Sequence, residues 1–165
     1  DYKEARGTYD RIVSIGMMEH LYPREHDTFF RFVSDHLADD GIGLSHFMSA
    51  FRAKTATDPF TQKYIFPGST HPRLSSIARS LEKHNMPVLD VENIGRHYLP
   101  TARHWLSNWR ANVHRLDRSK YDERFVRMWE YILCCYVAAC DALVSSLLQV
   151  LFAKDIRKTL PLHRV

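Results

Sequence analysis

The stretch that decides the fold is Tyr9-Asp-Arg-Ile-Val-Ser-Ile-Gly-Met-Met-Glu-His20, in which a short apolar run stops at Gly16. The β-branched residues at positions 12, 13 and 15 predict a buried strand, because such side chains fit a pleated surface better than a helix. The glycine lets the backbone approach whatever lies beyond the carboxyl edge of that strand. Ligands bind at this edge in open α/β sheets, so Glu19 and His20 are candidates for chemistry. The same residues also suit a strand followed by a solvated turn.

The bulk composition is that of an ordinary globular chain. Of 165 residues, 45% are hydrophobic and 25% are charged, which is enough for one domain over residues 1–165 with a real core. The net charge of +4, from 23 basic and 19 acidic residues, implies only a modest attraction to anionic partners. Basic residues do not alternate with aromatic ones in a run, so a nucleic-acid partner is not expected.

The cysteines and the most apolar stretch of the sequence indicate in which compartment the protein is expected and whether a segment crosses a membrane. Three cysteines, at positions 134, 135 and 140, lie in one apolar stretch, and an odd cluster of this kind predicts buried thiols in a reducing compartment such as the cytoplasm. The chain starts at Asp1 without a signal-peptide pattern, so no leader is expected. Residues 132–153 are apolar enough to suggest a transmembrane segment, but they include Asp141 and Gln149, which a bilayer would bury at high cost. They predict a helix end followed by a strand.

Hydrophobic periodicity predicts alternating helices and strands. A helix begins at Pro23 and ends in a turn at 39–41, and an alternating strand follows at 42–48. Residues 49–72 have no period and form a long connection, of the kind often used as a binding loop. Further helices are expected at 74–85, 100–109 and 121–140, with strands at 88–94 and 147–152 and a weakly ordered tail at 154–165. This order is typical of an α/β fold. Ten histidines are present without an H-x-x-x-H or H-E-x-x-H spacing, so no metal site is predicted.

Several motifs in collinear order carry a resemblance to a known family. They are Thr57-Asp-Pro-Phe60, Lys63-Tyr-Ile-Phe-Pro-Gly68, Asn93-Ile-Gly95 with Tyr98, Tyr121-Asp-Glu-Arg-Phe125 with Arg127-Met128, and Gln149-Val-Leu-Phe152. Together with the opening stretch, they make the chain resemble the cyclopropane-fatty-acyl-phospholipid synthases and mycolic acid cyclopropane synthases, which are S-adenosylmethionine-dependent methyltransferases. The resemblance covers nearly the whole chain. It implies the C-terminal portion of a Rossmann-like class I methyltransferase fold with helical insertions.

The glycine-rich cofactor turn of this family lies upstream of the matching segment. The nearest approach to it in this chain is Gly41-Ile-Gly43, which enters a predicted strand instead of following one. The resemblance therefore predicts that the 165 residues contain only part of the cofactor pocket. It also predicts an exposed sheet edge, where such a fold would normally continue.

The resemblance also implies a reaction and a set of site residues. In the family, an acyl alkene attacks the sulfonium methyl group, and the resulting carbocation loses a proton to a bound bicarbonate ion. Matching the motifs assigns the bicarbonate site, and hence catalysis, to Glu19, His46 and Tyr98. It assigns cofactor contacts to Ile15, Gly16 and His20, and the substrate lining to Phe47, Met48, Tyr64 and Phe66.

The implied ligands and partners follow from the same resemblance. The cofactors are S-adenosylmethionine and bicarbonate. The partner is a phospholipid acyl chain at a membrane surface, to which a cytoplasmic protein binds peripherally, and the chain is a candidate homodimer.

These assignments make physical sense as a set. The imidazole of His46 and the hydroxyl of Tyr98 are donors that a buried anion needs. Glu19 beside that anion must share a proton or have a raised pKa, which suits proton abstraction near neutral pH. Aromatic faces favour a carbocation, and the candidates for such a wall are Phe47, Phe51, Tyr64, Phe66 and Trp105.

Competing interpretations remain open. Considered alone, His46 shares a face with apolar residues and suits a core histidine, and Trp105 and Trp109, spaced i and i+4, are predicted to be core residues. Departures from the family pattern, such as Met48 in place of an isoleucine, leave open a methyl-branched, methylene or hydroxylated product. The chain also suits a non-catalytic lipid-binding or dimerising remnant, or a methyltransferase acting on a small soluble molecule.

Overall fold

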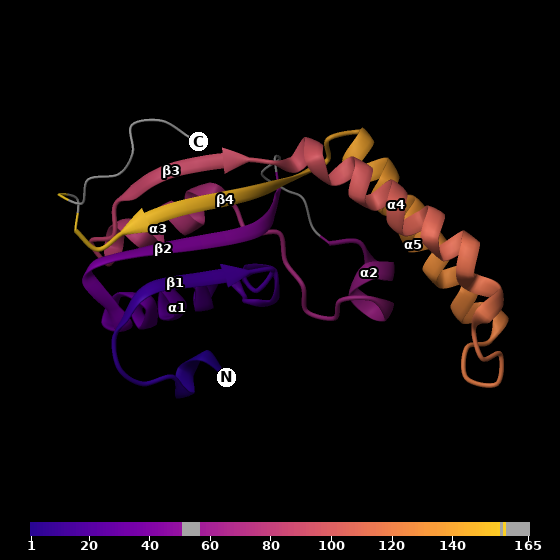
Figure 1. Cartoon of the computed structure of the whole chain (residues 1–165), viewed down its shortest axis with the longest axis horizontal. Helices are drawn as coiled ribbons and strands as arrows, with labels where there is room; N and C mark the ends of the chain where they lie inside the picture. Colours follow the sequence, from indigo (N-terminus) through magenta and orange to yellow (C-terminus); the bar gives the residue numbers. More distant parts are fainter. Residues whose placement is uncertain (51–56, 156, 158–165) are drawn as a thin grey trace.

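The computed structural model describes residues 1–50, 57–155 and 157, and these form one four-stranded sheet with helices (Figure 1). The strands are β1 (Tyr9–Ile15), β2 (Leu37–Ala50), β3 (Val88–Asn93) and β4 (Ser145–Ala153). The helices are α1 (Pro23–His36), α2 (Pro59–Tyr64), α3 (Leu74–Lys83), α4 (Tyr98–Asn112) and α5 (Glu123–Asp141). Short 3-10 turns are η1 (Tyr2–Glu4), η2 (Met18–His20), η3 (Gly95–His97) and η4 (Val113–Arg115).

The strand order is β1-β2-β4-β3, with β1 and β2 parallel and β4 antiparallel to both of its neighbours. Helices α1 and α3 pack on one face of this sheet. The core between them contains Phe30, Phe47, Phe152 and Val150, all essentially inaccessible to solvent. Burial of each such side chain contributes roughly 1.5–3 kcal/mol, so this layer holds the fold together. The predicted α/β class and the strand–helix order are confirmed.

The helices begin where the sequence provides caps. Pro23 stands at the first turn of α1, and the Tyr22 amide donates to the Glu25 carboxylate at 2.8 Å. The Asp58 carboxylate accepts from the Thr61 amide at the start of α2, and the Asp122 carboxylate accepts from the Phe125 amide at the start of α5.

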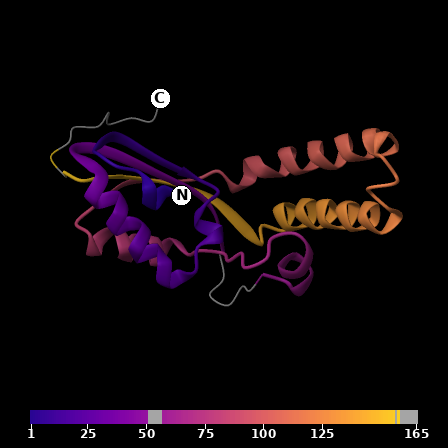
Figure 2. The ribbon, with the colours of Figure 1, turned by 90° about the horizontal axis from the view of Figure 1, so that it is seen from below.

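Helices α4 and α5 form an antiparallel hairpin that extends away from the sheet (Figure 2). It is inserted between β3 and β4, so its two ends emerge from the edge of the sheet near the carboxyl ends of β1 and β2. The ion pairs Arg103–Asp141 and Arg110–Glu130 join the two helices. The hairpin is the helical insertion that the sequence predicts.

The prediction that the first strand is buried is wrong. Strand β1 is an edge strand, and Val13 is 59% and Ile15 is 69% exposed. Its only buried residue is Ser14. Strand β1 has a pairing partner on one side only, and α1 and α3 cover only one face of the sheet, so β-branched side chains remain in contact with solvent. The exposed sheet edge that the resemblance implies is therefore present.

Two local predictions also need correction. Residues 39–41 do not form a turn after α1, because β2 begins directly at Leu37 and its register with β1 shifts between the pairs Tyr9–Leu37 and Arg11–Ile42. The connection predicted over 49–72 contains a short helix, α2, whose cap residue Asp58 marks its start. Residues 51–56, including Phe51, lie outside the described residues, as does most of the tail predicted from 154 onward.

Gly41-Ile-Gly43 has a packing role. Both glycines lie in β2, and a side chain at Gly43 would overlap the ring of Phe152 on the neighbouring strand β4. The pair is therefore a close contact within the sheet and takes no part in a cofactor turn.

The apolar window at 132–153 divides as predicted, with α5 ending at Asp141 and β4 beginning at Ser145. Among the described residues, no helix is long and apolar enough to cross a membrane. All three cysteines are free thiols, and Cys140 is buried.

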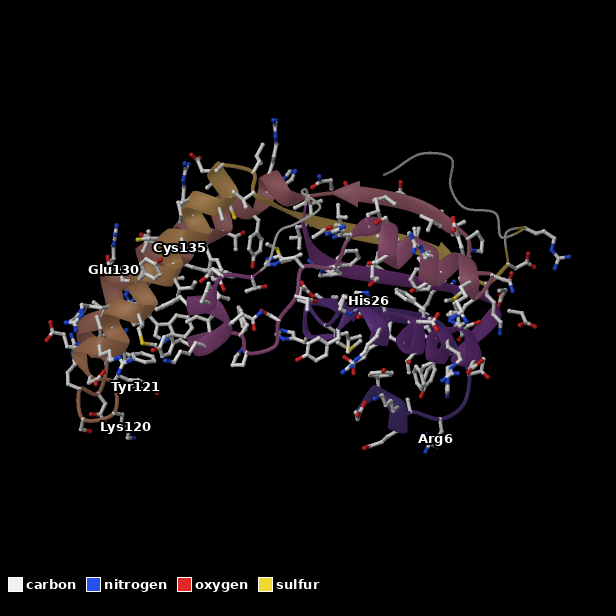
Figure 3. All side chains as sticks on the ribbon, turned by 180° about the vertical axis from the view of Figure 1, so that it is seen from behind. Arg6, His26, Lys120, Tyr121, Glu130 and Cys135 are labelled. Carbon is white, nitrogen blue, oxygen red and sulfur yellow. The ribbon has the colours of Figure 1, made fainter. Side chains whose placement is uncertain are left out.

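His26, on α1, is a buried histidine that makes stability depend on pH (Figure 3). It is 1% exposed, and neither ring nitrogen makes a hydrogen bond within the described part of the chain. Burial lowers its pKa, against the smaller opposing effect of the Met18 and Leu21 carbonyls. Below pH 6.5, the ordinary pKa of histidine, residue 26 therefore binds a proton in the unfolded chain and does not bind one in the folded chain.

We expect the free energy of unfolding to fall as the pH drops below about 6.5, by at most about 1.4 kcal/mol per pH unit for this group. Urea unfolding between pH 5 and 8 measures the slope. His26→Leu should flatten it, whereas His114→Asn at an exposed position should not. An unchanged slope in His26→Leu would assign the effect to other groups.

Candidate active site

A cavity of about 500 Å³ lies beyond the carboxyl ends of β1 and β2. It is bounded by η2, the end of β2, α2 with the segment that follows it, and the inner sides of α4 and α5. Most of its lining is apolar. The lining residues are Gly16, Glu19, His20, Met48, Thr57, Asp58, Thr61, Phe66, Ser69, Thr70, His71, Tyr98, Trp105, Ile132, Cys135, Tyr136, Ala139, Cys140 and Val144.

Glu19 is held in this cavity from both sides. The fully buried side chain of Met18 anchors the η2 turn, and the Thr70 amide donates to the Glu19 carbonyl at 2.7 Å. The Met48 amide donates to the Oε1 atom of Glu19 at 2.6 Å, which fixes the carboxylate against the end of β2. Its Oε2 atom is buried and has no hydrogen-bond partner among the described residues. A buried acceptor without a donor is costly, so this oxygen is suited to accept from a ligand.

His71 is a second ionisable group beside Glu19. The Thr57 hydroxyl lies 3.2 Å from its Nδ1 atom. Burial lowers the pKa of His71, while the charges of Glu19 and Asp58 partly oppose that shift. The imidazole is therefore predominantly neutral at pH 7 and available as a proton donor or acceptor.

Two tyrosines from the helical hairpin complete the polar part of the cavity. Burial, followed by the Cys140 and Glu19 side chains, raises the pKa of Tyr98. Burial also raises the pKa of Tyr136 to about 12, with Tyr98 as the next contributor. Both phenols therefore remain protonated at neutral pH, and Tyr98 can donate a hydrogen bond toward the carboxylate side of the cavity.

Aromatic rings form the walls. The ring of His20 meets Phe66 edge-on at 5.7 Å, and Tyr98 meets Trp105 edge-on at 5.5 Å. Gly16 has a positive φ of 64°, and a Cβ at this position would find nothing within 4 Å. The cavity is thus open beside Gly16, at the carboxyl end of β1.

The structure brings together six of the ten residues predicted for the site. These residues, which all line the cavity, are Gly16, Glu19, His20, Met48, Phe66 and Tyr98. The other four, Ile15, His46, Phe47 and Tyr64, are not part of the described lining.

Each of the four has a physical reason to lie elsewhere. Phe47 is fully buried in the core on the face covered by α1 and α3, because it alternates with Met48 along β2. Ile15 is on the exposed edge strand. His46 is half-buried and lies 3.3 Å from the amide of Gln149 on β4. Tyr64 is on the outer side of α2.

Sequence reasoning missed several lining residues. His71 and Thr57 lie in a segment without periodicity, and only the tertiary fold carries them to Glu19. Trp105, for which the sequence left open both a core position and a place in the aromatic wall, is 42% exposed and lines the cavity. The thiols of Cys135 and Cys140 and the phenol of Tyr136 face the cavity from α5, which the apolar composition of that helix does not reveal. No group of three or more potential metal ligands occurs among residues 1–50, 57–155 and 157.

The site lies at the carboxyl ends of the parallel strands, where open α/β sheets bind their ligands, and the fold is shared with solved methyltransferases such as coclaurine N-methyltransferase (TM-score 0.68, 20% identity, over 92% of this chain and 51% of that structure). A cyclopropane synthase from Mycobacterium tuberculosis superposes with a TM-score of 0.84 at 20% sequence identity, over 93% of this chain and 58% of that structure. A mycolic acid cyclopropane synthase solved with SAH and CTAB gives a TM-score of 0.81 at 21% identity, over 92% of this chain and 57% of that structure.

The chain belongs to the mycolic acid cyclopropane synthetase family, whose family model matches residues 1–150. It is also 35% identical over 164 residues to the cyclopropane-fatty-acyl-phospholipid synthase of Escherichia coli (strain K12). That match covers 99% of this chain and 42% of the relative, so the chain spans less than half of the relative's length.

Proposed function

We propose that this chain forms the acyl-binding and proton-accepting part of an enzyme that transfers a methyl group from S-adenosylmethionine to the double bond of an unsaturated phospholipid acyl chain. The observation that carries the proposal is the fixed carboxylate of Glu19, with its unpartnered oxygen, in an otherwise apolar cavity. The name of the E. coli relative, a synthase of cyclopropane fatty-acyl phospholipids, supports the choice of substrate.

The residues near β1 fit a bound S-adenosylmethionine. The open space beside Gly16 suits a bound ligand, and His20 lines the same cavity. When bound, the cofactor supplies an electrophilic methyl group. The mycolic acid cyclopropane synthase solved with SAH supports the choice of cofactor class. Ile15 stays a predicted cofactor contact on the neighbouring strand end.

The polar residues fit the removal of a proton from the methylated acyl chain. When the alkene takes up the methyl group, the S–CH₃ bond would break and S-adenosylhomocysteine would leave. The carbocation on the acyl chain would then lose a proton from the transferred methyl group, and the electron pair of that C–H bond would close the ring. Glu19 can hold that proton directly. Alternatively, a bicarbonate ion takes the proton, and the hydroxyl of that ion donates a hydrogen bond to the free oxygen of Glu19. Tyr98, protonated because of its raised pKa, and neutral His71 would donate hydrogen bonds to the same anion. The catalytic role of His46 stays a prediction.

The cavity walls suit the carbocation that would form on the acyl chain. Phe66, Trp105 and the two tyrosines present ring faces and edges around the space, and ring faces favour a positive charge. The apolar lining also excludes water, which would otherwise capture the carbocation as an alcohol. We propose that Met48 and Phe66 contact the acyl chain itself. Peripheral binding to a membrane, a cytoplasmic location and a homodimer belong to the same proposal.

The test is an assay of the complete natural protein with S-adenosylmethionine and vesicles of monounsaturated phospholipid. We expect the fatty acids to gain the mass of one CH₂ group and to lose their alkene proton signals in NMR. Vesicles of saturated phospholipid are the matched control and should give no product. A product that keeps an alkene would indicate a methyl or methylene branch. Methylation of small amines without lipid turnover would contradict the proposal.

Binding of S-adenosylhomocysteine distinguishes this proposed function from the alternative that the chain is a non-catalytic remnant. Titration calorimetry should give a micromolar dissociation constant for the complete natural protein. The absence of any binding there would favour a non-catalytic lipid-binding chain.

A further inference from the structure

A cluster of cationic and aromatic side chains lies on the surface where α2 meets α5. We call Lys63, Tyr64, Arg124 and Tyr131 the α2–α5 patch. The ammonium of Lys63 lies 5.1 Å and the guanidinium of Arg124 lies 5.7 Å from the centre of the Tyr64 ring. Arg124 also donates to the Tyr64 hydroxyl at 3.3 Å. Tyr131 joins the two helices, because its ring meets Phe60 of α2 edge-on at 4.8 Å.

The two cations of the patch form no ion pair, although the Asp58 carboxylate at the start of α2 acts on the patch residue Tyr131. Neither Lys63 nor Arg124 pairs with a carboxylate among the described residues, whereas Arg103, Arg110 and Arg127 of the same hairpin all do. A hydrogen bond and the charge of Lys63, and after them the charge of Arg124, lower the pKa of Tyr64. Two unpaired cations around one ring leave the patch able to attract an anion.

The aromatic side chains of the patch are exposed, although a surface that contacts only water does not require exposed rings. Tyr131 is 55% and Tyr64 is 38% exposed, and Phe66, two residues beyond Tyr64, is 44% exposed. Tyrosines with an apolar body and a polar tip suit the boundary between water and lipid, and long cationic side chains bury their stems there while their charges remain hydrated.

The patch borders the candidate active site. The same two helices contribute Thr61 from α2 and Ile132 and Cys135 from α5 to the cavity lining, and Phe66 reaches both the lining and the surface. Figure 3 shows Cys135 and Glu130 on α5, with Lys120 and Tyr121 at the far end of the hairpin. The cations and tyrosines therefore lie beside the apolar cavity, on the elements that form its wall.

We propose that the α2–α5 patch binds the anionic headgroups of a phospholipid bilayer and holds the cavity against the membrane from which the acyl chain is taken. This inference rests on the proposed function and deepens it by naming the surface that meets the lipid. Charge complementarity favours anionic headgroups, and the exposed rings next to the cations favour a bilayer over an acidic protein, which would require paired charges and not interfacial aromatics.

The experiment measures binding of the complete natural protein to vesicles, without turnover. Vesicles contain either phosphatidylglycerol mixed with phosphatidylcholine, or phosphatidylcholine alone. We expect Lys63→Glu with Arg124→Glu to weaken binding to the anionic vesicles by on the order of tenfold or more. The matched control is Arg31→Glu with Arg79→Glu, which makes the same charge change at exposed positions on α1 and α3 and should bind nearly as the parent does.

The outcomes are distinct. Equal weakening by the patch and control variants would mean that only net charge matters, and it would overturn the proposal. Unchanged binding by the patch variant would also overturn it, and would leave an acidic protein as the partner to consider. Tyr64→Ser with Tyr131→Ser should weaken binding to both vesicle types if the rings enter the interface. If the patch variant turns over phospholipid dispersed in neutral micelles at the parent's rate, the proposed function stands whatever vesicle binding shows.

Discussion

Glu19→Gln is expected to lower kcat for methylene transfer by about 10²- to 10⁴-fold, the range that a positioned acid–base group contributes. The substitution preserves the shape of the side chain, and its carbonyl oxygen can still accept from the Met48 amide. It removes the negative charge and the capacity to hold a proton. Turnover of unsaturated phospholipid by the complete natural protein measures the loss.

The control for this variant is Glu82→Gln, which removes one negative charge at an exposed position on α3. It should leave kcat within about twofold of the parent, as expected for a surface change. The KM for lipid should change little in Glu19→Gln, because the acyl chain contacts apolar walls. If Glu19→Gln kept more than half of the parent's kcat with an unchanged melting temperature, the proton-accepting role would be wrong.

Tyr98→Phe should cause a smaller loss of kcat than Glu19→Gln, since it removes a hydrogen-bond donor and leaves the proton acceptor in place.

Gly43→Ala should destabilise the fold by about 3 kcal/mol, at the upper end of what overpacking usually costs. The added methyl group would overlap the ring of Phe152, which is 1% exposed and closely surrounded in the core. Residues 43 and 152 are direct partners in the β2–β4 register, so neither strand can shift without breaking the sheet at its centre. Urea unfolding measures the change in free energy.

The test of this mechanism is a double variant. Phe152→Leu removes ring atoms from the overlap, so the cost of Gly43→Ala combined with Phe152→Leu should fall short of the sum of the single costs by at least about 1 kcal/mol. Strict additivity would show that the overlap with Phe152 is not the cause. The result would then point to the backbone of β2.

The sequence alone specified the fold class and most of the elements, although not α2 or the start of β2. The apolar runs at 12–15 and 42–48, the helical face after Pro23 and the long apolar α5 all appear where local pattern places them. Local signals suffice here because propensity, capping and periodicity agree in each element. The position of Glu19, three residues after a strand-ending glycine, was likewise enough to place it at the carboxyl edge of the sheet, and Tyr98 was found through its motif.

Only the tertiary structure decided which faces of these elements meet. Alternation along β2 shows that Phe47 and Met48 point in opposite directions, but it does not show which one faces the helices. The packing of α1 and α3 directs Phe47 into the core and leaves Met48 to the cavity. Val13 and Ile15 are exposed because β1 lies at the edge, which depends on strand order and not on composition. His71 and Tyr136 enter the cavity that contains Glu19 through contacts between distant segments, and such contacts leave no local pattern in the sequence.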